Sequence, residues 1–100
     1  MAATRVALIS GGNRGIGLEI ARQLARKNIA VVIGARDFEK GRAAAHTIAS
    51  DGLAAEAVVL DVTDGNSVAK AVENVVRRHG RIDILVNNAA ILVDGPGGFK

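Results

Sequence analysis

The chain has 100 residues, of which 49% are hydrophobic, and it contains no cysteine, which excludes disulfides and thiolate metal sites. Its formal net charge is +3, but the basic residues are dispersed and only 2% of the residues are aromatic, which argues against a stacking surface for nucleic acid. No stretch is long enough to span a bilayer, and the first apolar run is too short for the core of a signal peptide. We therefore expect at most one domain of a soluble cytoplasmic protein, with no nucleic-acid or membrane partner.

The first half of the chain alternates between apolar runs and helical patterns. Residues 5–10 form a short apolar run and residues 29–35 are rich in β-branched side chains, so each is predicted to be a buried strand. Apolar residues at helical spacing between them predict a helix with an inner face of Ile16, Ile20, Ala21 and Leu24. A second helix is predicted for residues 38–50 and would end at Gly52. Its expected inner face consists of Ala44, Ala45, Ile48 and Ala49.

The second half repeats this alternation. Residues 55–60 and 82–87 are predicted to be the third and fourth strands. The helix between them would be capped by Thr63 or Asp64 and ended by Gly80. Its expected inner face consists of Val68, Ala71, Val72, Val75 and Val76.

The four predicted strands are continuous apolar runs, which is typical of a parallel sheet that helices bury on both faces. Because crossovers between parallel strands are right-handed, the element order places the strands in the spatial order 3-2-1-4. The sequence therefore predicts an α/β fold, a doubly wound parallel sheet of the Rossmann type with the order βαβαβαβ. We interpret residues 1–100 as one partial domain of this kind, without repeats.

The stretch SGGNRGIG, residues 10–17, lies between the first predicted strand and the first helix. There the carboxyl edge of a parallel sheet opens beside its switch point, and the helix N-terminus directs unpaired N–H groups at the same space. Gly11 and Gly15 would permit a tight turn and a close backbone approach, and Gly17 would let the helix pack closely on the sheet. A plain turn needs only two glycines, so the stretch predicts a dinucleotide site, although Ile20 breaks the strict G-x-G-x-x-G pattern.

Three motifs in the expected order make the chain resemble the classical short-chain dehydrogenases/reductases. SGGNRGIG is similar to the T-G-x-x-x-G-x-G signature of that family, with Ser10 in place of the threonine. DVTD (61–64) resembles its acidic motif after the third strand, and NNAA (87–90) resembles its N-N-A-G, with Ala90 in place of the glycine. The run RVALISGGNRGIGLEIARQLA (5–25) resembles the carbonyl-reductase branch in particular.

The resemblance implies that these motifs bind a nicotinamide dinucleotide. The glycine stretch would line the pyrophosphate and the adenosine ribose, while Asp61 and the backbone of Val62 would hold the adenine edge. Asn88 and Ala89 would face the cofactor ribose, and Asn87 would tie the fourth strand to the end of the first. The expected cofactor-binding residues are Ser10, Gly11, Asn13, Arg14, Gly15, Ile16, Gly17, Arg36, Asp61, Val62, Asn88 and Ala89.

The end of the second strand is expected to select the cofactor. An acidic residue there would bind both ribose hydroxyls and repel a 2′-phosphate, but the resemblance places the neutral Ala35 at this position. Arg36 follows it and Arg14 lies in the glycine stretch opposite, and two guanidinium groups suit a phosphate. We therefore predict NADP(H) in preference to NAD(H). Asp37 would be the ribose acceptor if the strand ended two residues later, but we favour it as the cap of the second helix.

No catalytic residue is expected in this chain. Carbonyl reduction needs a proton donor, and the resemblance implies the tyrosine and lysine of a Y-x-x-x-K pattern with a serine, whereas the sequence has no tyrosine. In the family these residues, strands five to seven and the oligomer-forming helices lie beyond position 100. His46 and His79 are far apart without a supporting ligand pattern, so no metal site is expected, and His79 is interpreted as a cation at a helix end.

These features favour an NADP(H)-dependent oxidoreductase that interconverts small-molecule carbonyls and alcohols, present here as a cofactor-binding fragment that is inactive alone. A non-catalytic dinucleotide-binding module is the alternative if the chain is a natural short protein. A methyltransferase ranks last, because it would place an acidic residue at the end of the second strand and would not explain NNAA. We also expect low solubility or marginal stability, since the fourth strand would be an uncovered apolar edge.

Overall fold

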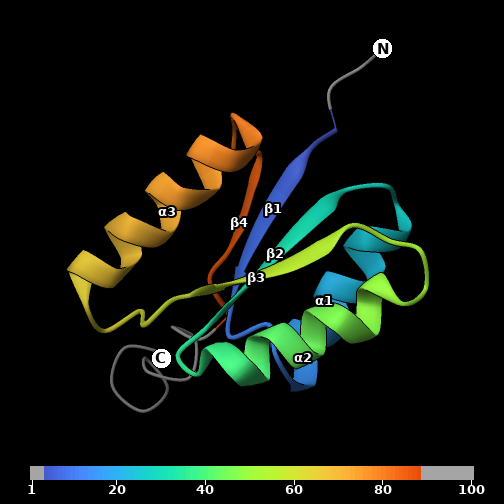
Figure 1. The fold of residues 1–100 in the computed structure, drawn as a ribbon, viewed down its shortest axis with the longest axis horizontal. Helices are drawn as coiled ribbons and strands as arrows, with labels where there is room; N and C mark the ends of the chain where they lie inside the picture. The colour runs from blue at the N-terminus through green and yellow to red at the C-terminus, as the bar shows by residue number, and fades with distance from the viewer. Residues whose placement is uncertain (1–3, 89–100) are drawn as a thin grey trace, which may run out of the picture.

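The structure of the protein, a computed structural model, describes residues 4–88, which form one four-stranded parallel sheet with three helices (Figure 1). The strands β1 (Val6–Ser10), β2 (Ala30–Ala35), β3 (Ala55–Val59) and β4 (Ile84–Val86) lie in the order β3-β2-β1-β4. They are connected by the helices α1 (Gly15–Arg26), α2 (Phe38–Ala49) and α3 (Gly65–His79). The predicted doubly wound α/β fold with strand order 3-2-1-4 is confirmed.

The helices divide between the two faces of the sheet. α1 and α2 pack on one face around a cluster that includes Ile9, Ile33 and Ile48, and α3 packs on the other face around Leu8 and Val75 (Figure 1). Leu8 and Ile9 are neighbours in β1 that belong to opposite clusters, and both are fully buried, as a continuous apolar strand predicts. The division follows from right-handed crossovers, because the connection from β3 to β4 crosses the sheet in the opposite direction to the two before it.

β4 is shorter than the predicted strand over residues 82–87, but hydrogen bonds extend its contact with β1 beyond both of its ends. At one end, the N–H of Val6 donates to Oδ2 of Asp83 at 2.7 Å, and the N–H of Asp83 donates to the Val6 carbonyl at 2.8 Å. At the other end, the hydroxyl of Ser10 donates to the Val86 carbonyl at 3.3 Å. β1 and β4 are therefore joined over a longer stretch than the strand bounds indicate.

Three residues predicted to line inner helix faces are exposed. Ile16 is 75% exposed because α1 begins only at Gly15, so its first turn lies at the glycine loop rather than over the core. Ala49 is the last residue of α2 and is exposed, and Val76 is 44% exposed. The buried residues of the helices are Gly17, Ala21 and Ala25 in α1, Gly41, Ala44, Ala45 and Ile48 in α2, and Ala71 and Val75 in α3.

The helix ends agree with the predicted capping residues. Asp37 precedes α2, and its carboxylate accepts the N–H groups of residues 39 and 40, so its predicted role as a helix cap is confirmed. Of the two candidates for α3, Asp64 is the cap and accepts the N–H of Asn66 at 3.0 Å. Gly80 ends α3 in the left-handed region with φ +85°, and Gly52 follows α2 with φ +82°.

Asp83 holds the start of β1 and β4 together at the edge of the sheet opposite the glycine loop. Besides the bond from Val6, its Oδ1 accepts both Nε and Nη2 of Arg81, at 2.9 and 2.6 Å. The hydrogen bond from Arg81, followed by that from the Val6 N–H, lowers the pKa of the Asp83 carboxyl below its usual value. The charged form of Asp83 is therefore part of the folded structure.

Asp83→Asn is expected to lower the free energy of unfolding at neutral pH. It should also make this free energy depend less on pH in the acid range. Because the pKa of Asp83 is lower in the folded than in the unfolded chain, the carboxylate stabilises the fold above the unfolded pKa. This contribution is lost as the pH falls through the folded pKa, whereas the variant has no carboxylate to protonate there. Urea denaturation of both proteins over the acid range measures the difference, and parallel curves of stability against pH would contradict it.

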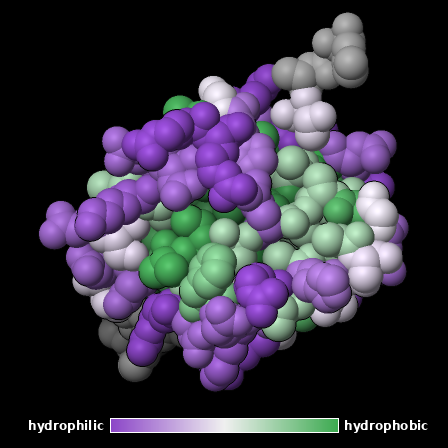
Figure 2. Space-filling view, viewed as in Figure 1, coloured by the Kyte–Doolittle hydropathy of each residue, from purple (hydrophilic) through white to green (hydrophobic). Residues whose placement is uncertain are grey.

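Several large apolar side chains remain exposed on the described part of the chain. Leu85 of β4 bears on the prediction that the fourth strand is an uncovered apolar edge. Leu85 pairs with Leu8 of β1 and lies on the same sheet face as α3, yet it is 64% exposed and does not pack against the cluster beneath α3. Figure 2 shows apolar residues open to solvent in the middle of the viewed face, surrounded by hydrophilic ones. Low solubility stays a prediction. None of the helices within residues 4–88 is long and apolar enough to cross a membrane.

Candidate dinucleotide-binding site

The glycine loop lies between β1 and α1, at the carboxyl end of the central strands. Gly11 and Gly15 adopt positive φ angles of 67° and 61°, which an L side chain rarely tolerates, and the N–H of Gly11 donates to the Gly34 carbonyl at 2.8 Å. Arg14 is the N-cap of α1 and makes no side-chain capping bond, in contrast to the aspartates that cap α2 and α3. The first-turn N–H groups of α1 are thus left without a side-chain acceptor, which suits an anionic ligand.

Gly17 is fixed by contacts that leave no room for a side chain. A Cβ on Gly17 would lie 2.5 Å from the carbonyl oxygen of Gly11 and 2.8 Å from Nδ2 of Asn88. The expected close packing of this glycine is confirmed, but its partners are the glycine loop and Asn88 rather than the strands of the sheet. The absence of a side chain at Gly17 therefore lets α1 lie directly against the carbonyl group of Gly11.

Two asparagines after β4 hold the glycine loop from the other side. The hydroxyl of Ser10 lies between two acceptors, the Val86 carbonyl and Oδ1 of Asn87, each at 3.3 Å, so the expected link from the fourth strand to the first is confirmed. Nδ2 of Asn88 donates to the Gly11 carbonyl at 3.4 Å. The sequence assigned Asn88 to the cofactor ribose and did not anticipate this contact, since only the fold brings its amide to the loop. Ala89, like the predicted tail after it, lies outside the described residues.

The end of β2 presents an unpaired cation beside a carboxylate that caps α2 through one oxygen. Ala35 is buried as the last residue of β2, Arg36 is exposed, and the Asp37 carboxylate is engaged as the cap of α2. Arg14 is also exposed, and neither Arg14 nor Arg36 forms an ion pair with another residue in the described range. Asn13 lies between the glycines of the loop and is half-buried.

The loop after β3 is anchored by Asp61. β3 ends at Val59, one residue before the predicted end, and Oδ1 of Asp61 then accepts the N–H and the hydroxyl of Thr63 at 3.0 and 2.6 Å. These two bonds lower the pKa of the Asp61 carboxyl, and the bond from the Thr63 hydroxyl has the larger effect. The positive charge of Arg36 contributes in the same direction. Val62 packs against the cluster beneath α3, which leaves its backbone as the part available to a ligand.

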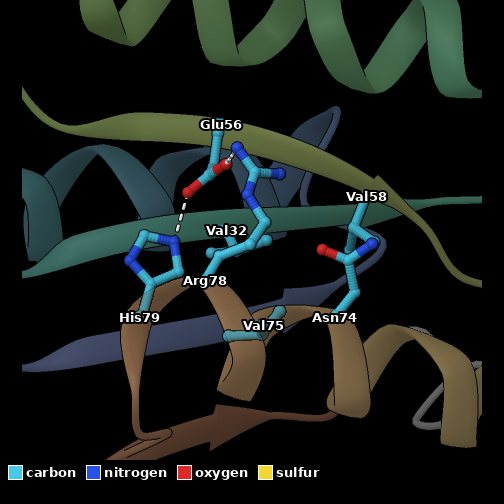
Figure 3. Close-up of a pocket in the computed structure, with 7 residues that line it drawn as sticks. All are labelled: Val32, Glu56, Val58, Asn74, Val75, Arg78 and His79. Carbon is cyan, nitrogen blue, oxygen red and sulfur yellow. Dashed lines mark hydrogen bonds and ion pairs between the residues drawn. The ribbon is translucent and has the colours of Figure 1, made fainter.

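Sequence reasoning missed a charged cluster on the α3 face of the sheet (Figure 3). Glu56 of β3 is flanked by Arg78 and His79 at the C-terminal end of α3: Nη2 of Arg78 pairs with its Oε1, and Nε2 of His79 lies against its Oε2. The three side chains, with Asn74, border a small pocket floored by valines. The signal was Glu56 itself, the one charged residue in the apolar run 55–60.

This cluster lies at the opposite end of β3 from the glycine loop and fastens α3 to an edge strand. His79, interpreted from the sequence only as a cation at a helix end, thus has an acidic partner. An inward-facing charge on an edge strand also discourages pairing with another chain. Among the described residues, no group of three or more histidine or acidic side chains could hold a metal ion.

The geometry of the glycine loop agrees with the comparisons to known proteins. The family model for short chain dehydrogenase matches residues 5–99. The chain belongs to the short-chain dehydrogenase family. Carbonyl reductase (NADPH) 1 of Sus scrofa is 40% identical over 99 residues, which cover 96% of this chain and 34% of that protein.

Solved structures of short-chain dehydrogenases share this arrangement of strands and helices. A metagenomic short-chain oxidoreductase in complex with NADP matches with a TM-score of 0.77 and 38% identity, covering 83% of this chain and 38% of that one. The F189W actinorhodin polyketide ketoreductase with NADPH matches with a TM-score of 0.82 and 38% identity, covering 88% and 34%. The chain therefore spans about a third of the length of these relatives.

Proposed function

We propose that this short-chain dehydrogenase chain is the NADP(H)-binding part of an oxidoreductase that interconverts small-molecule carbonyls and alcohols. The observation that carries the cofactor choice is the end of β2. There Arg36 is exposed and unpaired within the described residues, while Asp37 already accepts two N–H groups of α2. The two N–H groups of α2 fix Asp37 through Oδ1 alone, so the cofactor choice rests on Arg36, whose free guanidinium suits a 2′-phosphate.

The remaining parts of the proposed site follow the three loops at the carboxyl edge of the sheet. The uncapped first turn of α1, with Gly11, Gly15 and Gly17, would receive the pyrophosphate. Asp61 and the backbone of Val62 would hold the adenine, and Arg14 would join Arg36 at the 2′-phosphate. The proposed set is otherwise completed by Ser10, Asn13, Ile16, Asn88 and Ala89.

The nicotinamide of the bound cofactor would supply or accept the hydride. The residues of this chain would bind and orient the cofactor, but reduction of a carbonyl also needs a proton donor for the developing alkoxide. The chain contains no tyrosine, so we propose that it binds NADP(H) without catalysing transfer on its own. The alternative is a dinucleotide-binding module that takes part in no hydride transfer.

Arg36→Ala tests the choice of cofactor. We expect the dissociation constant for NADPH to rise by about 10- to 100-fold, because a charged hydrogen-bonding partner of the phosphate is lost. The constant for NADH should change little. Both dissociation constants are measured by the change in fluorescence of the reduced dinucleotide on binding, or by calorimetry.

Arg42→Ala is the matched control, since Arg42 is also exposed but is paired with Glu39 at 2.8 Å, whereas Arg36 is unpaired. It should leave both dissociation constants unchanged. Equal affinity of the unaltered protein for NADPH and NADH, or tighter binding of NADH, would refute the NADP(H) assignment.

A further inference from the structure

The carboxylate of Asp61 is held in one orientation by its own loop. Thr63 donates to the same oxygen, Oδ1, through both its N–H and its hydroxyl, and no described residue bonds to Oδ2. The backbone is fixed as well: the N–H of Asp61 donates to Oγ of Ser67 at 2.9 Å, and the N–H of Asp64 donates to the Asp61 carbonyl at 3.0 Å. A carboxylate fixed in this way can offer only Oδ2 to a ligand.

A competing partner for this carboxylate lies nearby. Arg36 follows β2, the strand that pairs with β3, and its charge is close enough to lower the pKa of Asp61. Even so, Arg36 and Asp61 form no ion pair. A carboxylate that was free to rotate would be drawn toward such an unpaired guanidinium, since opposite charges attract even at an exposed site, where solvent and salt weaken the attraction.

We propose that Thr63 is a positioning residue that holds Asp61 away from Arg36, so that Asp61 Oδ2 can accept the exocyclic amine of adenine while Arg36 stays available for the 2′-phosphate. This inference rests on the proposed function for its ligand. According to this inference, the exposed hydroxyl of Thr63 keeps the carboxylate of Asp61 apart from the guanidinium of Arg36. Ser67 supports the same arrangement through the backbone.

The test compares NADP⁺ with its deamino analogue, in which hypoxanthine replaces adenine and the exocyclic amine is absent. In the unaltered protein we expect NADP⁺ to bind about tenfold more tightly than the analogue. Thr63→Val removes the hydroxyl at nearly constant shape, and the ratio should fall to about two or less. Thr63→Ser keeps the hydroxyl and should keep the ratio. An unchanged ratio in Thr63→Val would overturn the inference.

A second readout needs no cofactor. The pKa of the Asp61 carboxyl is followed by NMR in four proteins: the unaltered chain, Thr63→Val, Arg36→Ala and the double variant. If Thr63 keeps the two charges apart, Arg36→Ala should raise this pKa more when residue 63 is valine than when it is threonine. Equal effects of Arg36→Ala in both backgrounds would overturn the inference. Failure of the unaltered protein to bind NADP⁺ would instead refute the proposed function and leave this result standing.

Discussion

Gly17→Ala is expected to abolish tight dinucleotide binding and to destabilise the fold by about 1–3 kcal/mol. The added Cβ would lie 2.5 Å from the Gly11 carbonyl oxygen and 2.8 Å from Nδ2 of Asn88, both closer than real contacts allow. The first obstacle is backbone, and the second is an amide that is itself bonded to that backbone at 3.4 Å. Relief would require α1 to move away from the glycine loop, which would displace the N–H groups proposed to receive the pyrophosphate.

The matched control is Gly65→Ala. Gly65 is also a helical glycine in the first turn, at the start of α3, and no atom lies within 4 Å of a Cβ built on it. Alanine there should be neutral or stabilising by up to about 1 kcal/mol, because it reduces the freedom of the unfolded chain. Urea denaturation and NADPH titration of both variants measure the two effects. Full NADPH affinity in Gly17→Ala would show that α1 tolerates the displacement.

Leu8→Ala is expected to lower the free energy of unfolding by about 2–5 kcal/mol. Leu8 is fully buried in the middle of β1, between β2 and β4, and belongs to the cluster beneath α3. Truncation would leave a cavity between strands whose backbones are fixed by pairing on both sides, so the site can collapse only in part. Much of the protein's stability would be lost, since small domains have only about 5–15 kcal/mol in total.

Leu85→Ala provides a control of identical chemistry on the same sheet face. Leu85 is the direct pairing partner of Leu8, but its side chain is 64% exposed. We expect its truncation to change stability by less than about 0.5 kcal/mol. A loss as large as that of Leu8→Ala would mean that another surface covers β4 in solution. Urea denaturation at several protein concentrations measures the effect and detects association.

The fold was predictable because its determinants are local or follow from chain handedness. Continuous apolar runs indicated a doubly covered parallel sheet, and right-handed crossovers then fixed the strand order. Asp37 and Gly80 could be assigned as helix ends, and the cap of α3 could be narrowed to Thr63 or Asp64, because capping depends on residues within a few positions of one another.

The details that were not predicted depend on how the ends of helices and strands are placed against one another in the fold. Helical periodicity placed Ile16 on an apolar face, but could not show that this turn lies past the covered part of the sheet. Glu56 meets His79 only because α3 runs back along β3 and brings its last turn to the start of that strand. The bond from Asn88 to Gly11 joins residues 77 positions apart and was not anticipated, whereas the link of the same span between Asn87 and Ser10 was expected only through the family resemblance.

The pairing of β1 with β4 has a consequence for how the protein is made. The bonds from Asn88 to Gly11 and between Ser10 and Asn87 each span 77 residues. At about 5–20 residues per second, a ribosome would synthesise the intervening chain in roughly 4–15 s. During that time β1 has no partner on its β4 side, and contacts of such long range are slow to form. The glycine loop, among the first segments to be synthesised, is therefore expected to be among the last to become rigid.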